Sequence, residues 1–212
     1  MEKSIFLDLD NTLVYQVPWV QSTQFETLAK ESPKSGLSKK GLEEVKKLLK
    51  EPDVCVMLGS IVMVVTPRPG VYEFLKELRA RTENLYIMTK GTVNHQSNVI
   101  QAAKLTDYFS GIFGRNSKLH PNMPLSVLVD NNSPRDKTTV WKMSLLGMID
   151  SERPGTMEYS EMVKAKYVQV SSFQNKSNDD PITAYLDEVL AKFNGLSAYA
   201  VSNWLKKSMK NT

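Results

Sequence analysis

The stretch IFLDLDNTLV, residues 5–14, begins as an apolar strand and ends in acidic and polar residues. Its first three residues are apolar, as expected for a central strand that is buried on both faces of a parallel sheet. Asp8 and Asp10 then follow two residues apart, so both would point to one face if the strand continued through Leu9. Two carboxylates that close repel by about 4 kcal/mol at an effective dielectric near 20. The pattern predicts a compensating cation, although capping of a turn or helix is an alternative reading.

Two other predicted strands end in polar residues as well. The stretch LYIMT ends on Thr89, and VLVD ends on Asp130, which Asn131 follows. In an open parallel sheet, ligands bind beyond the carboxyl ends of the strands. Three strand ends therefore bring an acidic pair, a hydroxyl and another acid to one sheet edge. Because all these donors are oxygen atoms, they favour Mg²⁺ as the bound cation.

Strands and helices alternate along most of the chain, which predicts a Rossmann-like parallel sheet sandwiched by helices. The predicted strands cover residues 4–9, 84–89, 110–114, 124–132 and 166–173, and the predicted helices cover 71–81, 93–105 and 181–193. These elements form one domain, residues 1–195. We expect residues 15–66 to be an insertion with a helix and a β-hairpin at Gly59-Ser60, forming a flap over the site. Residues 196–212 form a basic amphipathic tail, for which packing on the core is the simplest reading; contact with a partner or an anionic surface is the alternative.

The charge, the cysteine content and the lengths of the apolar stretches restrict the possible substrates and cellular location of the protein. Among 212 residues, Lys and Arg number 27 against 23 Asp and Glu, a net charge of +4. This mild excess suits an anionic substrate but supports nucleic-acid binding only weakly. The single Cys55 excludes an internal disulfide and favours a reducing compartment, so we expect a cytoplasmic protein. No stretch reaches the roughly 18 uninterrupted apolar residues of a membrane span, and the apolar start breaks too early for a secretory signal.

Several motifs together resemble a known family. DLDNTLV (residues 8–14) resembles the DxDx[TV] signature of the haloacid dehalogenase superfamily. PRPGVYEFLKEL (67–78) is similar to a segment of the NLI-interacting-factor-like phosphatases, the group that includes RNA polymerase carboxy-terminal-domain phosphatases. LVDNNSP (128–134) resembles the late acidic motif of that group, and residues 171–193 resemble its closing segment. The resemblance covers most of residues 4–193, with the motifs in the expected order.

The resemblance implies a haloacid-dehalogenase-like fold and a Mg²⁺-dependent phosphatase that forms an aspartyl-phosphate. Asp8 would be the nucleophile, and Asp10 would protonate the leaving oxygen and then activate water. Asp8, Asp130 and the backbone carbonyl of Asp10 would hold Mg²⁺, with Asn131 assisting. Thr89 would hydrogen-bond a phosphoryl oxygen.

Three further positions concern the substrate. The resemblance implies a lysine that neutralises the phosphate, and Lys118 in GRNSKLH is the best-placed candidate. Lys90 directly follows Thr89 and is a second candidate for contact with the phosphate or the rest of the substrate. Asn11, also expected at the substrate, stands where this group commonly has Glu. Arg68 either anchors the hairpin or reaches a phosphate, and we favour the anchoring role.

The expected function is therefore hydrolysis of a phosphomonoester, with phosphoserine or phosphothreonine in a protein as the expected substrate. A small-molecule phosphatase or nucleotidase and a polynucleotide 3′-phosphatase are alternatives with the same catalytic residues. A catalytically silent binding module is the non-enzyme alternative, and the presence of both Asp8 and Asp10 counts against it.

Overall fold

The computed structural model describes residues 3–18, 55–57, 63–115, 117, 125–146, 163–176 and 178–196. Five strands form the main sheet in the order β6-β5-β1-β7-β8, and every neighbouring pair is parallel. They are β1 (Ser4–Leu7), β5 (Leu85–Met88), β6 (Gly111–Phe113), β7 (Ser126–Asp130) and β8 (Tyr167–Gln169). The N-terminal strand is thus central, and all four of its residues are buried. The predicted Rossmann-like α/β fold is confirmed.

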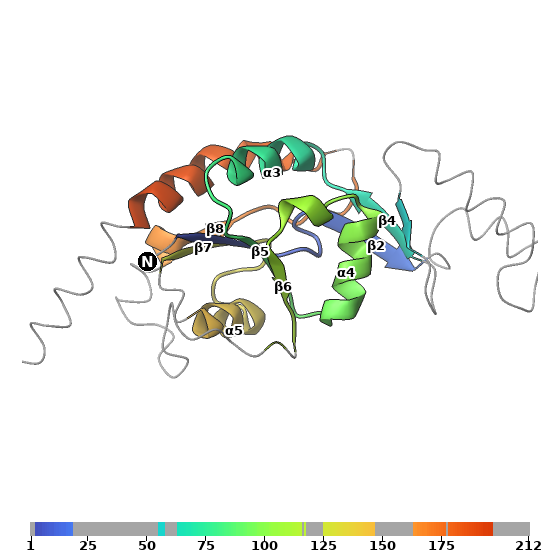
Figure 1. Cartoon of the computed structure of the whole chain (residues 1–212), viewed down its shortest axis with the longest axis horizontal. Helices are drawn as coiled ribbons and strands as arrows, with labels where there is room; N and C mark the ends of the chain where they lie inside the picture. The colour runs from blue at the N-terminus through green and yellow to red at the C-terminus, as the bar shows by residue number, and fades with distance from the viewer. Residues whose placement is uncertain are drawn as a thin grey trace, which may run out of the picture.

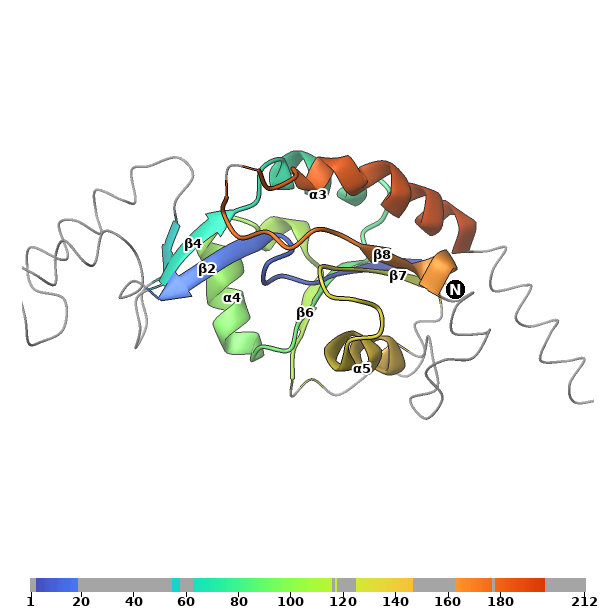
Figure 2. The same ribbon diagram turned by 180° about the vertical axis from the view of Figure 1, so that it is seen from behind.

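Helices cover both faces of the main sheet. The helices are α3 (Val71–Arg79), α4 (Val93–Ala102) and α5 (Lys137–Leu145), with the 3₁₀ helices η2 (Thr106–Tyr108) and η3 (Ile182–Tyr185), the latter continued by helical residues 186–196. Figure 1 shows α3 and the closing helix side by side over one face, with α5 on the other, and Figure 2 shows the same layers from behind. The three helices predicted outside the insertion are all present, whereas α5 was not predicted.

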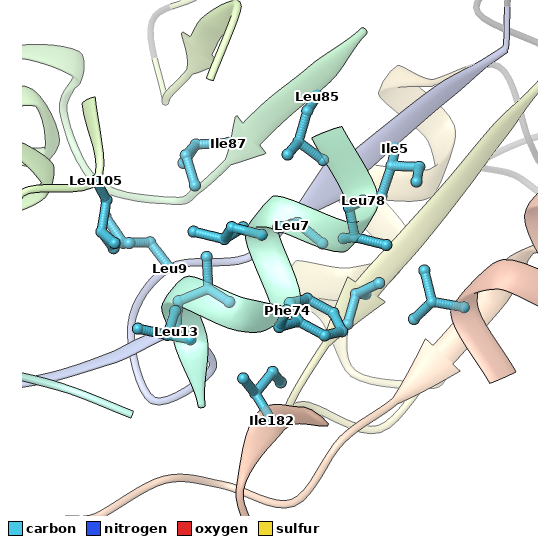
Figure 3. Packing of buried hydrophobic residues seen from close by; sticks show 14 of the residues in the cluster. Ile5, Leu7, Leu9, Leu13, Phe74, Leu78, Leu85, Ile87, Leu105 and Ile182 are labelled. Carbon is cyan, nitrogen blue, oxygen red and sulfur yellow. The ribbon is translucent and has the colours of Figure 1, made fainter. Parts of the chain in front are cut away.

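Strand alternation divides the core between the two faces. Odd-numbered residues of the central strands, such as Ile5 and Leu7, pack in the larger cluster with Phe74 of α3. Figure 3 shows this cluster. Even-numbered residues, such as Phe6 and Leu128, pack in a smaller cluster against α5. A side chain that continues the even series past the end of its strand is therefore directed toward the α5 face.

A second, antiparallel sheet has the order β2-β4-β3. Its strands are β2 (Val14–Pro18), β3 (Cys55–Met57) and β4 (Met63–Pro67). In Figure 1 this sheet lies beside α4, at the end of the described structure opposite the N-terminus. The two strands of the predicted hairpin pair as expected, but its turn and the predicted insertion helix fall outside the described residues, as does the tail beyond Leu196.

The predicted first strand was too long. The strand β1 ends at Leu7, and the Leu9 carbonyl accepts hydrogen bonds from the backbone N–H groups of Leu13 and Val14 at 3.0 and 3.1 Å, which closes a turn. Leu9 and Leu13 are both fully buried in the larger core cluster, as Figure 3 shows. Because both leucine side chains are buried in this cluster, the chain turns after Leu9 and does not continue as a strand of the main sheet. Asp8 and Asp10 consequently do not lie on one continuous strand.

Arg68 connects this turn to the closing segment. It is 1% exposed, and its guanidinium donates to the carbonyls of Thr12, Ser171 and Asp180 at 3.2, 3.0 and 2.8 Å. It also lies over the ring of Tyr185, 5.6 Å from the ring centre. Because Arg68 directly follows β4, these hydrogen bonds anchor the end of the hairpin to the turn after β1 and to the closing segment.

Replacing Arg68 with methionine is expected to lower the free energy of unfolding by roughly 2–4 kcal/mol, because several carbonyl groups lose their donor. Urea denaturation of the natural protein and the variant measures this difference. The exposed Arg135 provides a matched control, since Arg135→Met should change stability by less than about 0.5 kcal/mol. Equal stability of Arg68→Met and the natural protein would contradict the anchoring role.

Candidate active site

The carboxyl ends of β1 and β7 bring two acidic side chains together. The pairing of Leu7 with Val129 continues one step further, because the Asp8 N–H donates to the Val129 carbonyl at 2.9 Å. Asp8 and Asp130 therefore end neighbouring strands at the same level. Both continue the even-numbered series, which faces α5. Asp8 is 5% exposed and Asp130 is fully buried.

A lysine from α5 lies between the two acids. Lys142 Nζ is 2.6 Å from Asp8 Oδ1 and 2.7 Å from Asp130 Oδ2, and the Lys142 side chain is 1% exposed. The sequence analysis did not identify this residue. The sequence predicted repulsion between Asp8 and Asp10, whereas the ammonium group pairs with the carboxylates of Asp8 and Asp130.

The remaining carboxylate oxygens of this pair have polar partners. Asp8 Oδ2 accepts from the Thr12 hydroxyl at 3.2 Å, and the same hydroxyl lies 3.2 Å from Asn131 Oδ1. Asp130 Oδ1 accepts from the backbone N–H and the side-chain amide of Asn132, both at 2.9 Å. Three hydrogen bonds, one from Lys142 and two from Asn132, thus fix the position of the Asp130 carboxylate. Asp8 Oδ2, with one long hydrogen bond, is the less constrained oxygen.

The charges of the site perturb the titration of Asp8 and Lys142. Burial, followed by the negative charges of Asp130 and Asp10, raises the pKa of Asp8 from 3.8 to about 7, although Lys142 acts in the opposite direction. Burial alone would lower the pKa of Lys142, but the two carboxylates outweigh it and raise that pKa above its ordinary value. Lys142 therefore stays protonated, while the Asp8 carboxyl group loses its proton less readily than an ordinary aspartic acid.

Asp10 lies close enough to influence Asp8 but has different partners. Its Oδ1 accepts from the side-chain amide of Gln16, and its Oδ2 accepts from Gln96 Nε2 at 2.8 Å. The turn after β1 explains this direction, because Asp10 forms an isolated bridge with Val14 rather than extending the strand. The two carboxylates of the motif are thus placed at one site in different hydrogen-bond environments.

The remaining predicted residues have the following positions and partners. Thr89 is buried at the end of β5, beside β1, and its hydroxyl accepts from the Gly91 N–H at 3.0 Å. Lys90 is exposed, and its Nζ donates to the Thr138 hydroxyl at 3.2 Å. Asn11 has a φ of 59°, a left-handed conformation that Asn adopts more readily than most residues. Lys118 falls outside the described residues and stays a prediction.

The donor set for a metal ion consists of oxygen atoms. Within the described part of the chain, no three His, Cys, Asp or Glu side chains group into a metal cluster. A cation at the predicted position would therefore use backbone and amide oxygens besides carboxylates. Counting the ionised forms, Asp8, Asp10 and Asp130 together with Lys142 leave two negative charges. This balance and donor chemistry fit a divalent hard cation such as Mg²⁺.

Comparison with family models identifies the family of the chain. The family described as NLI interacting factor-like phosphatase matches residues 3–200. No curated protein sequence is significantly similar to the chain. None of the described helices is both long enough and apolar enough to cross a membrane.

The solved structures to which the chain is similar have low sequence identity to it. The fission yeast RNA polymerase II CTD phosphatase Fcp1, bound to beryllium fluoride, is 13% identical over 99% of this chain and 56% of that chain, with a TM-score of 0.45. A second Fcp1 structure is 14% identical over 99% and 53%, with a TM-score of 0.47. A HAD-superfamily hydrolase from Ehrlichia chaffeensis is 11% identical over 91% and 99%, with a TM-score of 0.43. The chain thus spans about half the length of the Fcp1 structures.

Proposed function

Because the chain belongs to the NLI interacting factor-like phosphatase family, we propose that it is a Mg²⁺-dependent phosphomonoesterase that acts through an aspartyl-phosphate on Asp8. The observation that carries this proposal is the buried Asp8 carboxylate at the end of the central strand, 2.6 Å from the ammonium group of Lys142. A carboxylate nucleophile divides a difficult hydrolysis into two easier displacements. Asp10, held apart from this pair, is available for proton transfer.

In the first displacement, one Asp8 oxygen attacks phosphorus, and the bond between phosphorus and the leaving oxygen breaks. The electron pair of that bond goes to the leaving oxygen, which takes a proton from Asp10. The products are an aspartyl-phosphate and a free alcohol. Protonation by a positioned side chain contributes typically 10²–10⁴-fold to such steps.

In the second displacement, a water oxygen attacks the same phosphorus atom while Asp10, now a carboxylate, takes a proton from the water. The bond between phosphorus and the Asp8 oxygen breaks, and its electron pair restores the Asp8 carboxylate. Inorganic phosphate leaves, and both acids return to their starting states. One proton is given and one is taken, so Asp10 is regenerated in each cycle.

Lys142 supplies fixed positive charge beside the nucleophile. Its ammonium group lies between Asp8 and Asp130, where it orients Asp8 and offsets charge that develops on the phosphoryl group. We assign to Lys142 the charge-neutralising role for which the sequence offered Lys118, and the contribution of Lys118 stays a prediction. Thr89, Lys90 and Asn11 are proposed to contact the phosphoryl group or the rest of the substrate.

The proposed metal ligands are Asp8, Asp130, the Asp10 carbonyl and the Asn131 amide oxygen. When bound, Mg²⁺ would supply Lewis-acid stabilisation of negative charge on the phosphoryl oxygens. The fit rests on the excess negative charge of the site and on the weakly bonded Asp8 Oδ2, whose only described hydrogen bond is 3.2 Å long. Asp130 would contribute through one of its two oxygens, of which Lys142 holds Oδ2 and Asn132 holds Oδ1.

The proposed substrate class is phosphoserine or phosphothreonine in a protein segment. The exposed Lys90 suits anionic groups that flank a phosphorylated residue. A cytoplasmic location, in line with the single Cys55, belongs to the same proposal. Comparing turnover of phosphopeptides, nucleoside monophosphates and 3′-phosphorylated oligonucleotides separates this class from the alternatives.

The first test is hydrolysis of a generic aryl phosphate by the natural protein, with Mg²⁺ and with an excess of chelator. We expect turnover with Mg²⁺ and loss of at least 100-fold with chelator, restored when Mg²⁺ is added back. Equal turnover under both conditions would contradict the metal requirement. Absence of hydrolysis from pH 5 to 8, together with inactivity toward the phosphopeptide panel, would contradict the phosphatase activity itself.

A further inference from the structure

The Asp10 carboxylate is held by two glutamines from different parts of the fold. Gln96, in the first turns of α4, donates from Nε2 to Asp10 Oδ2 at 2.8 Å. Gln16, in β2, donates to Oδ1 and is itself 3.1 Å from His95 Nε2 through Oε1. Each carboxylate oxygen therefore has its own amide donor. This arrangement fixes both the position and the rotation of the Asp10 carboxylate.

The burial of the Gln96 side chain is unfavourable for the stability of the fold. Its side chain is 1% exposed, and Oε1 is buried with no hydrogen-bond partner among the described residues. A buried polar atom without a partner is normally selected against, because it has lost its bonds to water. A residue that served only to fill this space would do better as an apolar side chain. The contact with Asp10 is the interaction that Gln96 gains.

A neighbouring glycine leaves room for this contact. A Cβ atom built on Gly91 would lie 2.3 Å from Gln96 Nε2, too close for both groups to keep their places. The φ angle of Gly91 is not in the left-handed region, so alanine is compatible with its backbone. Alanine at this position would displace the end of a flexible side chain rather than the backbone. The site thus needs a residue without a side chain at position 91 for Gln96 to reach Asp10.

We propose that Gln96 is a positioning residue for the proton transfers of Asp10, and that Gly91 is required to let it reach that carboxylate. This inference rests on the proposed phosphatase function. Gln96 acts through Asp10 and does not contact phosphorus. Because Asp10 must face the leaving oxygen and then the attacking water, loss of its orientation slows both displacements. The second displacement suffers most with an aryl substrate, whose good leaving group needs little help from an acid.

The test compares three variants with the natural protein. Gln96→Met removes the amide but keeps the length of the side chain, and Gly91→Ala displaces the amide without removing it. Gln101→Met makes the same chemical change at an exposed position of α4. For an aryl phosphate with Mg²⁺, we expect Gln96→Met and Gly91→Ala to lower steady-state turnover roughly 10- to 100-fold. Stopped-flow traces should then show a burst of one phenolate per enzyme, and Gln101→Met should behave as the natural protein.

A thermal melt separates positioning from a structural role. Gln96→Met should change the melting temperature little, because loss of the hydrogen bond to the part-buried Asp10 carboxylate is offset by removal of a buried unpartnered oxygen. Turnover of Gln96→Met within twofold of an active natural protein would overturn this inference and leave the proposed function intact. A loss of turnover that only follows a loss of folded protein would overturn it as well. Inactivity of the natural protein would overturn the proposed function first, and this inference with it.

Discussion

Replacing Lys142 with methionine is expected to lower phosphatase turnover about 10²–10³-fold and the free energy of unfolding by about 3–5 kcal/mol. Both effects follow from the ammonium group that lies 2.6 Å from Asp8 and 2.7 Å from Asp130. Without it, two buried carboxylates at adjacent strand ends lose the cation that pairs with them. Initial rates with saturating Mg²⁺ and denaturant titration measure the two effects.

Two companion variants make this prediction specific. Lys137→Met changes an exposed lysine of the same helix and should leave both quantities nearly unchanged. The double variant Lys142→Met with Asp130→Asn removes one buried carboxylate along with the lysine, so it should recover part of the lost stability without recovering turnover. A Lys142→Met protein that is folded and fully active would exclude Lys142 from the reaction.

Replacing Asp8 with asparagine is expected to abolish turnover and, in the absence of metal, to stabilise the fold above pH 7. The pKa of Asp8 is raised from 3.8 to about 7 in the native state, chiefly by burial. Between these pH values the native state keeps a proton that the unfolded chain has lost, so the stability of the natural protein falls as pH rises. The variant lacks this penalty. The difference should grow from near zero at pH 4 to at most about 4 kcal/mol at pH 8.

Thermal melts of both proteins in chelator, from pH 4 to pH 8, measure this difference. Adding Mg²⁺ at pH 8 should raise the melting temperature of the natural protein more than that of Asp8→Asn, because a cation favours the ionised carboxylate. A stability gap that shrinks as pH rises would contradict the assigned burial of Asp8. Stabilisation of both proteins by Mg²⁺ to the same extent would exclude Asp8 as a metal ligand.

The strand ends of the site were predictable because they are marked locally. Asp8, Thr89 and Asp130 each follow an apolar run, and the rules of parallel sheets bring such ends to one edge. The structure confirms the strands that carry them and the register between β1 and β7. The length of the first strand was not predictable in this way, because the turn depends on Leu9 and Leu13 finding places in the core.

Lys142 was missed for a physical reason. The segment KTTVWKMSL mixes polar and apolar residues without a clear apolar stripe, so neither α5 nor its buried face was evident from the pattern. A lysine within such a helix is ordinarily solvated, and only the two acids from distant strands make its burial favourable. The one available signal was the charge balance, because two neighbouring acidic strand ends require a cation from some nearby element.

The two glutamines that bind Asp10, like Lys142, could not be predicted from local sequence patterns. Gln96 and Gln16 lie 80 positions apart in a sequence where glutamine has no distinctive pattern, and only the folded chain brings them to one carboxylate. His95 likewise acquires a neighbour at the site through Gln16 rather than through any ligand spacing. Residues that act by orienting others are therefore found from contacts rather than from motifs.

Capture of the covalent intermediate tests the central claim most directly. The natural protein is mixed with an aryl phosphate and Mg²⁺, quenched in acid during turnover, digested and examined by mass spectrometry. We predict one phosphoryl group on the peptide that contains Asp8, removable by hydroxylamine as expected for an acyl phosphate, and none in Asp8→Asn. Turnover without a phosphoryl group on Asp8, or hydrolysis that persists in Asp8→Asn, would contradict the assignment of Asp8 as the nucleophile.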